Sequence, residues 1–122
     1  MKNIVIIGGT KGIGKAIVSE VVDNNNVVCL SRNQTDFSHD NYTFHNFDAL
    51  VDDYPDFESV DCLIYCPGSI NLKPISTLSL DDFRNDFELN VIGAVRAIKK
   101  YLNLLKKSGS ASILLFLSLI HI

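Results

Sequence analysis

The sequence has few cysteines, no surplus of positive charge and no long hydrophobic run, and each of these shortages excludes a class of protein. Its three cysteines, Cys29, Cys62 and Cys66, are odd in number and lie among apolar residues, which indicates reduced core thiols and not a disulfide framework. Eleven basic residues stand against 14 acidic ones, for a net charge of −3, so we expect neither nucleic acid nor an acidic membrane as a partner. No apolar run approaches the roughly 18 residues of a membrane span. Together these features predict a cytoplasmic globular protein.

Short apolar runs and helical segments alternate along the chain. Strands are expected over residues 4–7, 27–30, 42–47, 61–66 and 113–116. Most of these runs are continuously apolar, which favours strands buried on both faces of a parallel sheet. Helices are expected over residues 12–22 and 48–57, and a polar loop over 31–41. The alternation predicts an α/β fold with a doubly wound parallel sheet that stops at about the fifth strand.

A long helix is predicted after residue 78, with Ser79 or Asp81 as its N-cap. Large apolar side chains recur there every three or four residues and form one stripe over about six turns. The stripe comprises Phe83, Phe87, Val91, Val95, Ile98, Leu102 and Leu105. Val91 is expected in the core, and the segment 108–110 is expected to end the helix.

Three glycines, Gly8, Gly12 and Gly14, stand where the first strand turns into the first helix. Glycine lets the backbone approach a ligand closely, and a helix N-terminus offers free N–H groups to a phosphate. The stretch from Gly9 to Lys15 nearly matches the P-loop of nucleotide triphosphatases. However, Ala16 stands where that motif needs a Ser or Thr to hold magnesium, so we expect a different phosphate ligand.

The spacing Gly8-x3-Gly12-x-Gly14 resembles the glycine pattern of short-chain dehydrogenases/reductases, and Ile13 sits between the last two glycines as is usual there. Further resemblances cover nearly the whole chain. Asp48 follows the third strand, where family members place an Asp against adenine, and Asn90 lies in a segment similar to the one that carries the family's structural and catalytic Asn. The family's Asn-Asn-Ala-Gly motif is replaced by residues 65–68, of which only Gly68 matches.

The resemblance implies a Rossmann-like fold and an oxidoreductase that transfers hydride between nicotinamide and a small-molecule carbonyl or secondary alcohol. Arg32 follows the second strand, where NAD-specific sites place an acid, and Lys11 precedes the second glycine, so we expect NADP(H) as the cofactor. The expected cofactor-binding residues are Gly8, Thr10, Lys11, Gly12, Ile13, Gly14, Ser31, Arg32, Asp48, Gly68 and Asn90. No metal site is expected, because the histidines show no metal spacing with the cysteines.

Each of these residues also has an interpretation that needs no cofactor. Asp48 could cap the next helix, Asn90 could be a polar residue on a helix surface, and Lys11 and Arg32 could be solvated charges. The order and spacing of the matches together favour the family.

The family's catalytic Tyr-x3-Lys pair belongs beyond the fifth strand and has no counterpart in this sequence. Asn90 and Ser118 match the family's other catalytic positions. Because the Tyr-x3-Lys pair is missing, we expect the chain as given to be inactive. The different-class alternative is a non-catalytic NADP-binding or regulatory module. By resemblance, the intact enzyme is expected to be a homo-oligomer.

The last six residues raise a question of origin. Residues 117–122 equal the translation of a widely used transposase sequencing adapter, and such segments are excluded from fold reasoning. We therefore expect residues 1–116 to be the cofactor-binding part of a Rossmann domain and residues 117–122 to be a non-native tail. The match of Ser118 with the catalytic Ser is then a coincidence.

Overall fold

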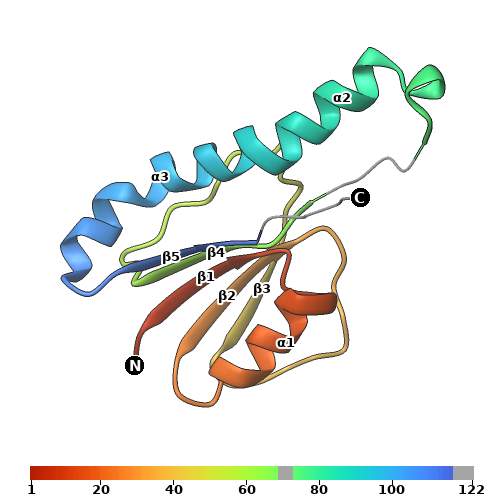
Figure 1. The fold of residues 1–122 in the computed structure, drawn as a ribbon. Coiled ribbons are helices and arrows are strands. Elements are labelled where there is room, and N and C mark those ends of the chain that lie inside the picture. The colour runs from red at the N-terminus through yellow and green to blue at the C-terminus, as the bar shows by residue number, and fades with distance from the viewer. Residues whose placement is uncertain (69–72, 117–122) are drawn as a thin grey trace.

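The computed structural model describes residues 1–68 and 73–116 and has a five-stranded parallel sheet at its centre (Figure 1). The strand order is β3-β2-β1-β4-β5, so β1 lies in the middle. The strands are β1 (Asn3–Ile7), β2 (Asn26–Ser31), β3 (Tyr42–Asn46), β4 (Cys62–Tyr65) and β5 (Ser112–Leu115). All four pairings are parallel, as the continuous apolar runs predicted.

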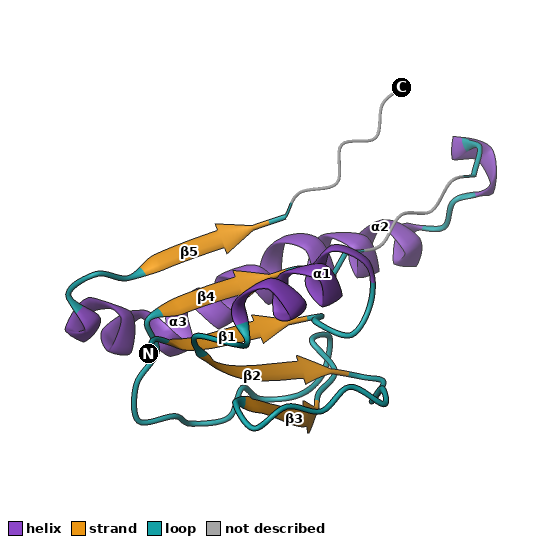
Figure 2. Ribbon diagram, turned by 90° about the horizontal axis from the view of Figure 1, so that it is seen from below, coloured by secondary structure: helices purple, strands orange, loops and turns teal. Residues whose placement is uncertain are grey.

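Helices cover both faces of this sheet. Helix α1 (Gly12–Val21) lies on one face and α3 (Gly93–Ser108) on the other, and α2 (Leu80–Phe87) continues the line of α3 past the end of the sheet (Figures 1 and 2). Two buried clusters result, one between α1 and the sheet around Ile6 and the other between α3 and the sheet around Leu63. The predicted doubly wound α/β architecture is therefore confirmed.

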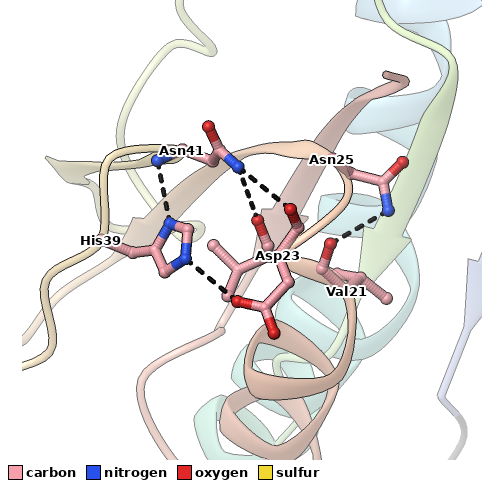
Figure 3. Close-up of polar contacts among 6 residues, drawn as sticks. Val21, Asp23, Asn25, His39 and Asn41 are labelled. Atoms are coloured by element: carbon pink, nitrogen blue, oxygen red, sulfur yellow. Dashed lines mark hydrogen bonds and ion pairs between the residues drawn. The ribbon is translucent and has the colours of Figure 1, made fainter.

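The connection from β2 to β3 contains no helix, as the polar composition of residues 31–41 predicted. Side chains tie this loop to the end of α1 (Figure 3). The Asn41 amide donates to the Val22 carbonyl over 2.9 Å. The Asn41 backbone N–H donates to His39 Nδ1, so the other ring nitrogen carries the hydrogen that bonds Asp23 over 3.1 Å. These bonds take the place of a crossover helix in anchoring β3.

The prediction of a short helix over residues 48–57 is wrong, because the structure has only a turn there. The Asp48 carboxylate accepts a hydrogen bond from the Leu50 backbone N–H over 2.9 Å. The Asp52 carboxylate accepts one from the Asp48 backbone N–H over 2.7 Å. Pro55 disfavours helical geometry in the residue before it, and buried Tyr54 packs on the neighbouring Phe47 ring at 4.6 Å between centroids. Local side-chain bonds and aromatic packing therefore outcompete the helix.

The predicted long helix is present, and Ser79 caps it in a reciprocal pair of hydrogen bonds with Asp82. It is interrupted by a π-helical segment, Glu88–Ile92, between α2 and α3. Gly109, in a left-handed conformation with a φ of 79°, ends α3. The sequence predicted this end within residues 108–110.

The predicted apolar stripe coincides only in part with the buried face of this helix: Leu105 is buried and Ile98 packs against the core. Small residues at the start of α3, Gly93, Ala94 and Ala97, face the sheet, because only small side chains allow so close an approach. Most large apolar residues of the stripe are exposed instead, namely Phe83, Phe87, Val91, Val95 and Leu102. The expectation that Val91 lies in the core is therefore wrong.

Candidate cofactor-binding site

A cavity of about 350 Å³ lies at the carboxyl ends of β1, β2 and β4. The chain leaves β1 toward α1 on one face of the sheet and returns through α3 on the other, so this edge is the switch point where open α/β sheets bind ligands. Most predicted cofactor-binding residues line the cavity: Gly8, Thr10, Lys11, Ile13, Gly14, Ser31, Arg32, Asp48 and Gly68. Gly12 and Asn90 are the two that are not among its lining residues.

The glycine loop folds tightly over the end of β1. Gly8 has a φ of 81° and Gly12 a φ of 53°, which side chains rarely adopt. A Cβ on Gly14 would collide with the Gly8 carbonyl oxygen. The missing side chains therefore leave a cradle of bare backbone, and no side chain caps the N-terminus of α1. The first N–H groups of α1 are therefore available to an anionic ligand.

Two hydroxyl residues and two basic residues line the cavity where the glycine loop meets the end of β2. The buried Thr10 hydroxyl lies 2.9 Å from the Ser31 hydroxyl, which links the glycine loop to the end of β2. Lys11 and Arg32, each next to one of these hydroxyl residues, are exposed. Within the described residues neither cation takes part in an ion pair. Both residues therefore line the cavity without an ion-pair partner in the described part of the chain.

Asp48 supplies the one carboxylate among the described residues that line the cavity. Its half-buried side chain caps the turn that follows it through the Leu50 N–H. The capping role that the sequence left open is therefore real, although the residue caps a turn and not a helix. Its position on the cavity wall is also compatible with the role beside adenine.

Asn90 lies beside Gly68, although the two residues come from different elements. A Cβ added to Gly68 would stand 3.0 Å from Asn90 Oδ1. Gly68 lines the cavity and Asn90 is half-buried just behind it. The structure thus brings these two predicted residues together, while predicted Ser118 lies outside the described residues.

Several lining residues were missed by the sequence-based prediction. Cys66 is one of them, and burial raises the pKa of its thiol to about 11, so the cavity wall there is neutral and apolar. Others come from the segments that follow β2, β3 and β4, among them Asn33, Ala49, Leu50 and Pro67. Their positions directly after predicted strands could have marked them, because strand ends of a parallel sheet share one edge.

All four tyrosines lie within the described residues, and none lines the cavity. Three of their hydroxyls donate to backbone carbonyls: Tyr54 to Gly93, Tyr65 to Leu89 and Tyr101 to Pro55. These three hydroxyls therefore bond the backbone, and none of them lies on the cavity wall.

Residues 1–68 and 73–116 contain neither a metal-binding cluster nor a membrane-spanning helix. No group of three or more His, Cys, Asp or Glu side chains there could hold a metal ion. No helix in the same residues has both the length and the apolar character needed to cross a membrane.

Comparison with known proteins places this geometry in context. The family model described as short chain dehydrogenase matches residues 34–120. No curated protein matches the chain in sequence. A short chain dehydrogenase family protein from Francisella tularensis is 27% identical, with a TM-score of 0.78 over 93% of this chain and 49% of that one.

Two other solved structures share the fold and contain a bound nicotinamide cofactor. A Leptospira borgpetersenii short chain dehydrogenase with bound NAD+ is 19% identical, with a TM-score of 0.78 over 92% of this chain and 49% of that one. An ElxO variant with NADPH bound is 24% identical, with a TM-score of 0.75 over 93% of this chain and 54% of that one. The chain therefore spans about half the length of the structures that it matches.

Proposed function

The chain belongs to the short chain dehydrogenase family, and we propose that it forms the NADP(H)-binding part of an oxidoreductase. The intact enzyme would act on a small-molecule carbonyl or secondary alcohol. When bound, the nicotinamide would supply or accept the hydride. The described residues would bind and orient the cofactor, because no tyrosine among them reaches the cavity to serve as a proton donor. The chain as given is then a binding unit without catalytic activity of its own.

The glycine loop fits the pyrophosphate of such a cofactor. Gly8 and Gly14 leave bare backbone where a side chain would fill the space. The N–H groups at the start of α1, from Gly12 to Gly14, would donate to the phosphate oxygens, and the positive end of the helix would favour their charge. Asp48 would lie toward the adenine.

The observation that carries the NADP(H) assignment is the pair of exposed cations, Lys11 and Arg32, on one wall of the cavity. A ribose 2′-phosphate would receive charge-assisted hydrogen bonds from Arg32 and a second positive charge from Lys11. An NAD-specific site would instead present a carboxylate to the 2′-hydroxyl at this position, and here Ser31 and Arg32 occupy the end of β2.

Replacement of Arg32 tests this assignment. Because a hydrogen bond to a charged group contributes about 1.5–3 kcal/mol, we expect Arg32→Asp to weaken NADPH binding about 10- to 100-fold and NADH binding far less. The binding of both cofactors, and of ATP as a competitor, is measured by calorimetry. Arg84→Asp is the matched control, since Arg84 is an exposed arginine of α2 paired with Asp81 and absent from the cavity. Equal weakening of NADPH and NADH by Arg32→Asp would contradict the assignment.

The homo-oligomer implied by family membership is also a proposal. The exposed apolar residues of α2 and α3, including Phe83, Phe87 and Val95, provide a surface suited to pairing with a second copy. Sedimentation of the full-length protein checks this directly, with a dimer or higher oligomer as the expected result.

A further inference from the structure

The π-helical segment Glu88–Ile92 is the one interruption of the line formed by α2 and α3, and Asn90 lies at its centre. In this segment the Gly93 N–H donates to the Glu88 carbonyl, five residues earlier, and not to the Leu89 carbonyl four residues earlier. Such single-turn π segments are rare and occur often at functional sites. Something must therefore hold this one against the ordinary α-helical pattern.

Tyr65 provides the missing donor. Its hydroxyl donates to the Leu89 carbonyl over 2.5 Å, from the end of β4 and from beneath the helix. The side chain is only 2% exposed, so its position is held by the core. Burial also raises the pKa of Tyr65 to about 12, so the hydroxyl keeps its proton and remains a donor at neutral pH.

Gly93 completes the arrangement from the side of the helix. A Cβ at this position would collide with the Tyr65 hydroxyl and would stand 3.2 Å from Cζ of the same ring. The phenol thus fills the space that a side chain at position 93 would need. Tyr65 and Gly93 are therefore a matched pair, which we call the Tyr65–Gly93 contact.

The contact bears directly on the position of Asn90. Each residue of an α-helix advances about 100° around the axis, so a change between π and α hydrogen bonding here would turn the side chains of the segment. In the observed register Asn90 Oδ1 lies next to Gly68, at the cavity wall. Tyr65 lies three residues before Gly68 along the same chain segment.

We propose that Tyr65 and Gly93 are positioning residues, which hold the π-helical segment and so place the Asn90 side chain against Gly68 at the cavity wall. The proposal rests on the proposed function, because Asn90 matters to chemistry only if the cavity holds a nicotinamide cofactor. Tyr65 acts through the Leu89 carbonyl and does not touch the cavity itself.

The test follows the side-chain amide of Asn90 by NMR in the full chain, with its resonance assigned by loss in Asn90→Ala. We expect Tyr65→Phe to shift this resonance in the free protein and to reduce by at least half the further shift that NADPH causes. Tyr101→Phe is the matched control. Tyr101 is an equally buried tyrosine whose hydroxyl donates to a backbone carbonyl, that of Pro55, away from the π segment. It should leave the Asn90 resonance as in the wild type.

A second variant approaches the contact from the helix side. Gly93→Ala pushes the phenol away from Leu89 and should move the Asn90 resonance as well, so it decides the matter if Tyr65→Phe does not fold. An unmoved Asn90 resonance in the folded variant would overturn the proposal. So would equal shifts in Tyr65→Phe and Tyr101→Phe, because these would indicate a general loss of packing. Failure of the wild type to bind NADPH would refute the proposed function alone, since the free-protein spectra test the positioning independently.

Discussion

The glycine loop and the Tyr65–Gly93 contact both bring two parts of the chain unusually close, but they differ in what stands opposite the glycine. At Gly14 the neighbour is backbone, namely the carbonyl of Gly8 and the Cα of Gly9. At Gly93 the neighbour is the far end of the Tyr65 side chain. The close approach at Gly14 is set by the path of the backbone, whatever the neighbouring side chains are. The close approach at Gly93 exists only because residue 93 is a glycine and residue 65 is a tyrosine.

This difference decides how each contact can be altered. A backbone neighbour cannot be replaced, so nothing except glycine fits at Gly14 while the loop keeps its path. A side-chain neighbour can be shortened, so the restriction on Gly93 lasts only as long as Tyr65 is a tyrosine. Substitutions at the two glycines should therefore respond differently to a change at Tyr65.

The largest effect is expected for Gly14→Ala. The new methyl group must displace the Gly8 carbonyl, and such overpacking lowers the free energy of unfolding by about 3 kcal/mol. NADPH binding should be lost as well, because the moved carbonyl closes the phosphate cradle. Urea denaturation measures the stability and calorimetry measures the binding.

Gly109→Ala is the control for that prediction. Gly109 has a φ of 79° but no atom within 4 Å of an added Cβ, so the substitution meets only the backbone penalty of about 1 kcal/mol. Gly14, unlike Gly109, has no positive φ, so a loss of stability in Gly14→Ala no greater than that in Gly109→Ala would contradict the close approach to the Gly8 carbonyl.

A smaller effect is expected for Gly93→Ala, about 2 kcal/mol, because the clash with Tyr65 is partly offset by the better helix propensity of alanine. In the Tyr65→Phe background the same change should cost at least about 1 kcal/mol less, since the colliding hydroxyl is gone. A double-mutant cycle by urea denaturation measures this coupling.

The same cycle with Gly14→Ala is the matched comparison. Tyr65→Phe leaves the Gly8 carbonyl in place, so the two changes should add within about 0.5 kcal/mol. Coupling of Tyr65→Phe with Gly14→Ala as strong as that with Gly93→Ala would contradict the distinction between the two contacts.

The contrast also explains which parts of the molecule could be predicted from the sequence. The three central strands β1, β2 and β4 were predictable because burial on both faces of a parallel sheet produces a continuous apolar run. The glycine loop was predictable because a close approach of the backbone requires glycine at fixed spacing. The cavity residues of the loop and of β2, such as Thr10 and Arg32, followed from their place at strand ends. Here local sequence and tertiary structure agree.

The long helix shows where such prediction stops. Hydrophobic periodicity located the helix but identified the wrong face, since Phe87 and Val91 are exposed and Ala97 is fully buried. Periodicity follows the polarity of side chains, whereas the close approach at the start of α3 selects small ones, and large buried side chains return only farther along, at Tyr101 and Leu105. The Tyr65–Gly93 contact joins residues 28 positions apart, and no local pattern reports such a pair.

The smallest expected effect on stability is at Asp61, whose charged side chain joins the start of β1 to the end of α3. Its carboxylate accepts the Asn3 N–H over 2.7 Å, at the start of the strand that leads to the glycine loop. It also accepts the Ser108 hydroxyl over 2.6 Å, at the end of α3. The hydrogen bonds, that of Ser108 first, lower the pKa of Asp61 below its ordinary value.

A group with a lowered pKa in the folded state stabilises the fold above its unfolded pKa, which is about 3.9 for Asp. That stabilisation is lost as the pH falls through the lower, folded pKa. We therefore expect Asp61→Asn to lower the denaturation midpoint slightly between about pH 5 and pH 8, and the difference from wild type to shrink steadily in stronger acid. Asp53→Asn is the control, because Asp53 is exposed and makes no hydrogen bond or ion pair in the described part of the chain. A deficit of Asp61→Asn that stays constant down to about pH 2 would mean that the side chain acts through its shape and not through its charge.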